Sequence, residues 1–363
     1  MEEEEKPKSG FDHLKDEVQR GIEGKNNGIP IGFNRINRYI GIRKRIMTLI
    51  FGPTGSGKTS LMHDMYILNP FDYFLKNRDI KRNYKFILFS MERSKVYVLA
   101  KWISRKIFIE EGIYIPIQKL LGWWTDNRLT KDEHDLFLHY QWYIDEILEM
   151  VDFVEGPQNP TGIYKYVKNF AEKHGRVEEI SEFKKVYIPN DPDLIVGIGE
   201  DHLGLTKLEK GLNTKKEAID KVSEYNQVFR DFYGFTPVPV SQLTRNLNNP
   251  IYQKMDSFEP TIDDIKESGR PGEDSDVVIS IFEPLRYRTN DPSYKAENFV
   301  DQSTGAKYFR SVKILKNSYG EDDVRAGLAF MGSTSILKEL PKAREMEGFD
   351  FQQIFNGQYF LNN

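Results

Sequence analysis

Short apolar runs alternate with helical stretches along most of the chain. The run from Arg45 to Phe51, RIMTLIF, leads straight into a glycine-rich turn, and Ser60 to Ile67 then has the spacing of a helix. Further short apolar runs lie at 85–90, 193–198, 236–240 and 276–281. Strands that read as continuous apolar runs between helices are typical of a parallel sheet covered on both faces. The pattern predicts one α/β domain with a doubly wound, mostly parallel sheet.

A short amphipathic helix precedes this domain. Phe11, Leu14, Val18 and Ile22 recur at spacings of three and four, and the Gly and Asn residues of 24–28 end the pattern. Flanking segments are polar. We expect residues 1–10, with four consecutive glutamates, to be disordered, 176–192 and 285–306 to be insertions or local excursions, and 341–363 to be a C-terminal tail.

Composition limits the chemistry. The 363 residues include no cysteine, which excludes a disulfide framework and a zinc-thiolate site. The formal net charge is −4, so any nucleic acid must meet a local basic patch. The chain has no apolar run of about 18 residues, and its N-terminus is acidic where a secretory signal is basic. We expect a soluble, cytoplasmic protein without membrane contact, in a host cytoplasm if the origin is viral.

The segment GPTGSGKT at 52–59 matches the P-loop pattern in full, between an expected strand and an expected helix. Glycines let backbone N–H groups turn toward an anion, and the helix N-terminus adds partial positive charge. Lys58 is placed to reach the outer phosphates and Thr59 to hold Mg²⁺. We therefore expect ATP to be bound by Gly52, Pro53, Thr54, Gly55, Ser56, Gly57, Lys58, Thr59 and Ser60.

Hydrolysis also requires a carboxylate near the metal and a group that positions the attacking water. The apolar run at 194–198 ends in Gly199, Glu200 and Asp201. Asp201 is the expected metal ligand, with Glu200 as the alternative. Glu92 follows the run at 86–90 and is the candidate base, because ligands bind at the carboxyl edge of such sheets. A helix-start or surface carboxylate is the alternative interpretation of either acid.

Five segments together resemble the ATPase domain of DnaB-like hexameric helicases of superfamily 4, a RecA-like fold. They cover roughly residues 11 to 332 in the family's order. The segments are GIPIGF at 28–33 with the P-loop after it, FSMERS at 89–94, DHLGL at 201–205, SQLTR at 241–245, and DIKESG at 264–269 continuing to EDSDVV at 273–278.

The resemblance implies a RecA-like ATPase domain at 28–340 that works in a ring, six-membered by analogy. ATP is then hydrolysed between neighbours, with Glu92 as catalytic glutamate and Gln242 sensing the γ-phosphate. The helix at 11–27 would be a linker that packs on a neighbour; packing on its own domain is the alternative. The implied activity is 5′ to 3′ translocation on single-stranded DNA in replication.

The trans-acting cation is where this chain departs from the family. The family has a lysine and an arginine two residues apart on a late strand, whereas KILKN at 313–317 places isoleucine and lysine at the best-matching positions. Lys316 is therefore the expected finger, with Arg310 and Arg325 as alternatives. Lysine lacks the planar fork of arginine, so slow or partner-dependent turnover would follow.

Two segments are candidates for the DNA-facing side, because phosphate contacts supply most sequence-independent affinity. One follows the strand that ends at Asp201, and the other belongs to the family-like loop near 266. A solvated helix face is the alternative for the first segment. The expected DNA-contacting residues are Lys207, Lys210, Lys215, Lys216, Arg245, Lys266, Glu267 and Gly269.

The short segment before the expected ATPase domain bears on the candidate partners and on the alternative functions. About 30 residues precede the expected ATPase domain, too few for the primase-contacting helical domain of replicative relatives. The chain resembles phage-type helicases in this respect, with primase or polymerase as candidate partners. The alternatives are another RecA-like DNA motor, such as a recombinase or packaging ATPase, and a nucleotide-switched DNA clamp with little turnover.

Overall fold

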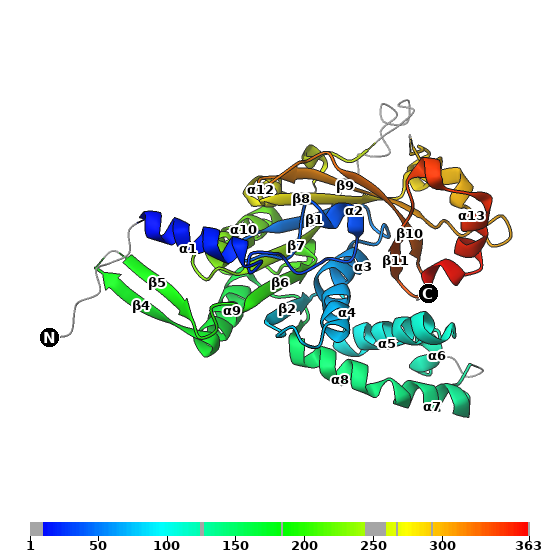
Figure 1. The fold of residues 1–363 in the computed structure, drawn as a ribbon, viewed down its shortest axis with the longest axis horizontal. Coiled ribbons are helices and arrows are strands. Elements are labelled where there is room, and N and C mark those ends of the chain that lie inside the picture. The colour runs from blue at the N-terminus through cyan, green and yellow to red at the C-terminus, as the bar shows by residue number, and fades with distance from the viewer. Residues whose placement is uncertain are drawn as a thin grey trace.

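One large sheet organises the molecule (Figure 1). The computed structural model describes residues 10–123, 127–182, 184–243, 259–265, 268–291 and 293–361. Within these residues, nine strands form the sheet in the order β11-β10-β9-β8-β1-β7-β6-β2-β3. The strands are β1 (Thr48–Gly52), β2 (Tyr84–Ser90), β3 (Val151–Glu155), β6 (Ile195–Asp201), β7 (Thr236–Gln242), β8 (Val277–Phe282), β9 (Phe309–Asn317), β10 (Arg325–Met331) and β11 (Ile336–Glu339).

The six strands from β8 to β3 are parallel, and β9, β10 and β11 extend the sheet as an antiparallel meander. Register aligns the carboxyl ends of the parallel strands. Gly52 on β1 lies opposite Gln242 on β7, and Asp201 on β6 lies opposite Ser90 on β2. Loops that follow these four strands therefore meet at one edge of the sheet.

Helices cover both faces because side chains alternate along each strand. Phe86 and Leu88 pack on one face with α3 (Lys58–His63), the π-helix η1 (Asp64–Leu68), α4 (Asn69–Lys76), α5 (Lys95–Glu111) and α8 (Gln141–Met150). Ile87 and Phe89 pack on the other face with α9 (Pro160–His174) and α10 (Lys215–Asp231). The double burial explains why these strands read as continuous apolar runs.

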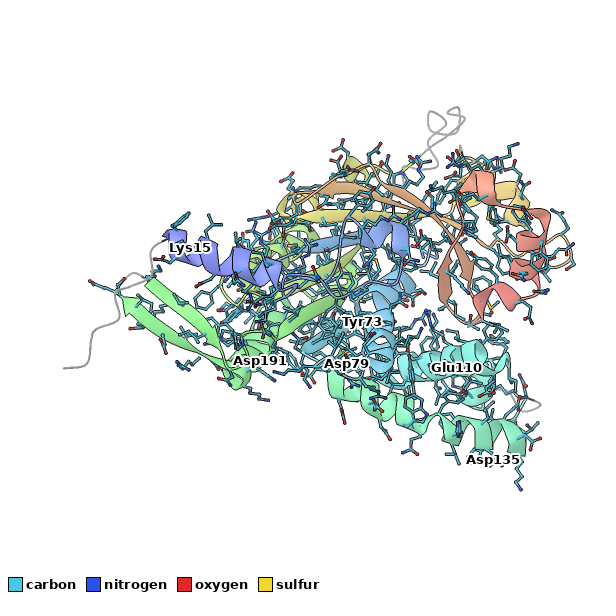
Figure 2. All side chains as sticks on the ribbon, viewed as in Figure 1. Lys15, Tyr73, Asp79, Glu110, Asp135 and Asp191 are labelled. Carbon is cyan, nitrogen blue, oxygen red and sulfur yellow. The ribbon has the colours of Figure 1, made fainter. Side chains whose placement is uncertain are left out.

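Two elements project from the domain at the N-terminal side (Figure 1). Helix α1 (Gly10–Ile22) is joined to the domain by an ion pair of Arg20 with Asp193 at 3.0 Å. The hairpin of β4 (Gly175–Ser181) and β5 (Lys184–Pro189) forms a separate antiparallel ribbon. In Figure 2, Lys15 on α1 and Asp135 on α7 (Lys131–His139) lie at opposite ends of the long axis.

The apolar stripe of α1 is exposed to solvent. Phe11, Leu14, Val18 and Ile22 have exposed fractions of 63, 55, 54 and 75%. The helix predicted from their spacing is confirmed, but this apolar face does not pack on its own domain. A helix whose apolar side faces water lacks the tertiary packing that normally stabilises a helix, so the stripe has the character of an unfilled interface.

The five predicted strands are confirmed, with shifts of at most three residues at their ends. The helix predicted at 60–67 begins earlier, at Lys58, and continues through η1 into α4. Of the stretch 176–192, the described residues of β4 and β5 form the projecting hairpin. In the stretch 285–306, the described residues form short 3-10 turns, and Ala296 and Phe299 pack in a core cluster.

The C-terminal segment is folded onto the domain. Helix α13 (Gly348–Phe355) and the turn after it bury Ile354 and Phe360 against β10 and β11. The segment expected as a tail thus belongs to the packed structure as far as residue 361. Residues 1–9 lie outside the described residues. Among the described residues, no helix combines the length and apolar character needed to cross a membrane.

Candidate functional site

Backbone geometry explains the glycines of the P-loop. The loop leaves β1 at Gly52, turns through Gly55 (φ +79°) and Gly57 (φ +104°), and enters α3 at Lys58. Positive φ values favour glycine. At Gly52 the reason is close packing, since a Cβ there would lie 2.2 Å from the carbonyl oxygen of Ile281. The motif therefore has the anion-cradling backbone that its pattern predicts.

The side chain of Lys58 folds back over this loop. Its Nζ donates to the carbonyl oxygen of Pro53 at 2.8 Å, and only 8% of the residue is exposed. Burial lowers the pKa of Lys58 to about 8, and the charge of Asp201 opposes that shift. The ammonium is thus held at the loop's mouth, where an anionic ligand would offset its desolvation.

The loop meets a carboxylate at the end of β6. Thr59 Oγ1 donates to Asp201 Oδ2 at 2.8 Å. Burial raises the pKa of Asp201 to about 6, while the bond from Thr59 opposes the rise. A hydroxyl and a buried carboxylate are hard oxygen ligands of the kind Mg²⁺ prefers, and Mg²⁺ commonly takes few protein ligands beside substrate phosphates. The described residues contain no cluster of three or more His, Cys, Asp or Glu side chains suited to a metal.

Glu200, the alternative metal ligand, points to the other face of β6. It is fully buried and accepts from Asn226 Nδ2 on α10 at 2.8 Å. Burial raises its pKa to about 8. Because successive strand side chains alternate, only one of the two acids can face Thr59, and the fold turns Asp201 toward the P-loop.

Glu92 and Gln242 lie at the same edge. Glu92 is 46% exposed and forms an ion pair with Arg93 at 3.2 Å, and its charge contributes to the raised pKa of Asp201. The Gln242 amide donates to Nε2 of His202, the residue after Asp201, at 3.1 Å. The ends of β6 and β7 are therefore linked directly beside the P-loop.

Two arginines that the sequence did not single out for the P-loop also reach it. Arg310 Nε, at the start of β9, donates to the carbonyl of Ser56 at 3.0 Å, and its guanidinium pairs with Glu283 at 3.3 Å. Arg286, in the turn after β8, donates to the carbonyl of Thr54. The partners of these two contacts lie 254 and 232 positions apart in the sequence. No local sequence pattern predicts contacts over such separations.

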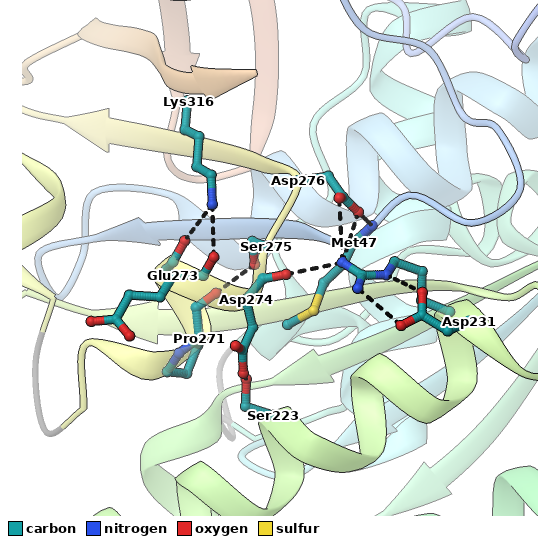
Figure 3. Close-up of polar contacts among 11 residues, drawn as sticks. Met47, Ser223, Asp231, Pro271, Glu273, Asp274, Ser275, Asp276 and Lys316 are labelled. Carbon is teal, nitrogen blue, oxygen red and sulfur yellow. Dashed lines mark hydrogen bonds and ion pairs between the residues drawn. The ribbon is translucent and has the colours of Figure 1, made fainter. Parts of the chain in front are cut away.

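The expected finger, Lys316, lies at the opposite edge of the sheet. Lys316 on β9 is opposite Val278 at the amino end of β8, whereas the P-loop adjoins the carboxyl end. Its Nζ donates to the carbonyl of Glu273, the fourth residue of α12 (Arg270–Asp274), at 2.7 Å (Figure 3). Lys316 therefore cannot serve the nucleotide site of its own subunit.

The two alternative fingers are engaged within the subunit. Arg310 is 5% exposed and contacts its own P-loop, so burial keeps it from a neighbour. Arg325 on β10 pairs with Glu259 and, at 3.5 Å, with Asp291. Lys316 differs from both arginines. Among the described residues, its ammonium bonds only to backbone carbonyls.

The expected DNA-facing residues are only partly described. Lys207, Lys210 and Lys216 are exposed between β6 and the first turn of α10. Lys215 is half-buried and donates to the carbonyl of Thr206. Gly269 immediately precedes α12. Arg245, Lys266 and Glu267 lie outside the described residues.

Comparisons with known proteins place this arrangement in a known fold. No family model and no curated protein matches the chain. Among solved structures, the chain is similar to an ATPase domain with a TM-score of 0.64 and 20% identity over 92% of this chain and 100% of that chain. It is also similar to a DnaB-like replicative helicase solved for its interactions with primase, with a TM-score of 0.62 and 18% identity over 93% of this chain and 68% of that one. The chain therefore has the RecA-like fold of DnaB-like helicase ATPase domains.

Proposed function

We propose that this chain is an ATP-dependent DNA helicase that forms a ring and moves 5′ to 3′ on single-stranded DNA in replication. The observation that carries the proposal is the contact of Thr59 with Asp201 at 2.8 Å beside a complete P-loop. That contact joins the two parts of a nucleotide-hydrolysing site in a fold that the chain shares with helicase ATPase domains. The direction of travel and the replicative role rest on family resemblance.

Each residue has a chemical role in the proposed reaction. Lys58 and the loop amides bind the phosphates, and Glu92 accepts a proton from the attacking water. Thr59 and Asp201 would hold Mg²⁺, which supplies charge neutralisation when bound. Gln242 is positioned to sense the outer phosphate and to transmit its presence through His202 to β6.

The sheet supports the proposed sharing of the site between subunits. One subunit has its P-loop at one edge and Lys316 at the other, so a nucleotide can meet both only if two copies associate head to tail. Repeated heterologous contacts of this kind form a ring when the rotation between neighbours closes. We propose six subunits, by analogy with the family.

The exposed stripe of α1 supports the same assembly. Its proposed occupant in the ring is a second copy of this chain, whose α7 and α8 expose Leu138 (48%) and Trp142 (40%). Helix α7 lies at the side of the molecule away from α1 (Figure 1). A stripe at one end and apolar groups at the other suit head-to-tail contact. Burial of both apolar surfaces would favour association.

The DNA path is proposed along the loops that follow β6 and β7. Lys207 comes six residues after Asp201, and the segment after Gln242 contains Arg245. Because the Gln242–His202 bond joins the two strand ends, a change at the nucleotide can reach both loops. This short connection is the proposed basis for coupling hydrolysis to strand movement.

The test is steady-state ATP hydrolysis with and without single-stranded DNA, together with unwinding of forks that carry a 5′ or a 3′ tail. We expect DNA to stimulate hydrolysis and only the 5′-tailed fork to be opened. Glu92→Gln should bind ATP but lose turnover, and Lys58→Ala should lose binding. Glu149→Gln, with a side chain 75% exposed on α8, is the control.

Two outcomes would remove the helicase proposal. An ATP hydrolysis rate that changes neither with DNA nor with the Glu92→Gln substitution would contradict the helicase proposal. Hydrolysis stimulated by DNA without opening of any fork would favour a recombinase or packaging motor, and nucleotide-dependent DNA binding with negligible turnover would favour a clamp.

A further inference from the structure

Arg286 is held directly against the P-loop by the turn that follows β8. The turn η5 (Pro284–Tyr287) begins two residues after the end of β8, which pairs with β1. Nη1 of Arg286 donates to the carbonyl of Thr54. A Cβ built on Gly55 would lie 2.5 Å from the same nitrogen, so the missing side chain at Gly55 leaves room for the guanidinium.

The charge of Arg286 acts on the phosphate-binding lysine. Its proximity contributes, after burial, to the lowered pKa of Lys58. Two cations are thus held beside one loop, and a bound anion there would add to the attraction that Lys58 already has to Asp201 and Glu92. The natural anion at a P-loop is a phosphate group.

Comparison with Arg310 shows that the two arginines differ in role. Arg310 is buried, pairs with Glu283 and lies over the Phe330 ring at 4.8 Å. Arg286 is exposed, and within the described part of the chain its guanidinium has no carboxylate partner within 4.0 Å. Arg310 therefore has the contacts of a structural support, whereas Arg286 retains donors directed to solvent at the mouth of the site.

We propose that Arg286 is a second phosphate-binding cation, supplied by the same subunit as the P-loop, for the nucleoside triphosphate. The inference rests on the proposed nucleotide site and adds a residue to it. A guanidinium has five N–H donors, of which the Thr54 carbonyl takes one, so the others can form charge-assisted bonds to phosphate oxygens. Arg286 acts in binding, in contrast to Lys316, which acts on turnover from the neighbour.

The test is equilibrium binding of fluorescent ATP and GTP analogues to the full chain with Mg²⁺. Arg286→Ala should weaken binding about tenfold or more, because it removes a charge-assisted bond. Arg286→Lys should recover part of that affinity, since it restores charge without the fork. Arg288→Ala removes an exposed arginine two residues away and should change affinity less than about twofold.

Two further measurements distinguish phosphate binding by Arg286 from recognition of the base and from a structural role. A phosphate contact predicts equal losses for the ATP and GTP analogues and an unchanged Tm without nucleotide. Unchanged binding, a loss confined to one base, or a fall in Tm matching the loss of binding would each overturn the inference. Wild-type protein that binds no nucleotide would overturn the proposed function as well, whereas normal wild-type binding beside an unaffected Arg286→Ala overturns the inference alone.

Discussion

Lys316 donates a hydrogen bond to the backbone carbonyl of Glu273 at 2.7 Å and so ties β9 to α12 (Figure 3). The second carbonyl within reach, that of Gly272, is at 3.4 Å. Helix α12 begins one residue after Gly269, in the loop proposed to face DNA. In the proposed action of Lys316 on a neighbour's nucleotide, this bond must break first, so the position of α12 would control the availability of the ammonium.

Lys316→Ala is expected to lower DNA-stimulated ATP turnover by at least about tenfold while leaving nucleotide affinity unchanged, because a trans-acting cation stabilises the transition state. Mixing this variant with Lys58→Ala should restore part of the activity, since some interfaces then contain both intact groups. Steady-state hydrolysis of the mixture measures this.

Lys338→Ala is the matched control for Lys316, because Lys338 also donates from a strand to a backbone carbonyl, that of Leu361 at 3.0 Å. It should leave turnover unchanged. A mixture no more active than its two components would show that Lys316 serves only to hold α12.

Replacing both Leu14 and Val18 with Asp is expected to prevent assembly without lowering the Tm of the isolated subunit. Their side chains are more than half exposed, so the substitutions remove apolar surface from an interface and not from the core. Light scattering after gel filtration reports the oligomeric state, and ATP turnover should fall with it. Lys15→Asp on the same helix should assemble normally; equal assembly of both variants would assign α1 a role outside the ring.

Glu200→Gln is expected to make stability less dependent on pH. The folded state raises the pKa of Glu200 from 4.5 to about 8 by burial, so between these values it retains a proton that the unfolded chain releases. The free energy of unfolding therefore falls as pH rises through this window. Glutamine keeps an acceptor for Asn226 and has no proton to lose.

Urea unfolding at about pH 6 and about pH 9 measures this effect. Wild-type protein should lose more stability between the two than Glu200→Gln, and Glu149→Gln should follow the wild type. Parallel losses in all three proteins would mean that Glu200 is ionised in the fold.

Substituting Lys207, Lys210 and Lys216 with Ala is expected to weaken the binding of single-stranded DNA and to make that binding less dependent on salt concentration. On a log-log plot the slope should become shallower by about 0.7 for each phosphate that the variant no longer neutralises. Lys215→Ala should change the slope less, because that half-buried ammonium is bonded to the Thr206 carbonyl and is less available to a phosphate. A triple substitution of Lys165, Lys168 and Lys173 on α9 is the control; an equal change of slope there would indicate a diffuse charge effect.

The sequence by itself determined the features that depend on neighbouring residues. The P-loop at 52–59 was evident because its backbone conformation follows from the spacing of its own glycines, and Gly55 and Gly57 have the expected positive φ. The strand predicted at 85–90, which spans Tyr84–Ser90 in the structure, was evident because burial on both faces leaves a continuous apolar run. The helix predicted from Phe11 to Ile22, which spans Gly10–Ile22 in the structure, was evident because its apolar period is local.

Only the tertiary structure decided which side chains meet across the sheet. Alternation on β6 requires Glu200 and Asp201 to face opposite ways, but strand register and helix packing select Asp201 for Thr59. The same holds for Arg286, brought to Thr54 across 232 residues, and for Lys316, placed at the far edge by antiparallel pairing with β8. A local sequence pattern indicates the backbone conformation and the burial of a residue. The distant partners of that residue depend on how the strands are ordered in space.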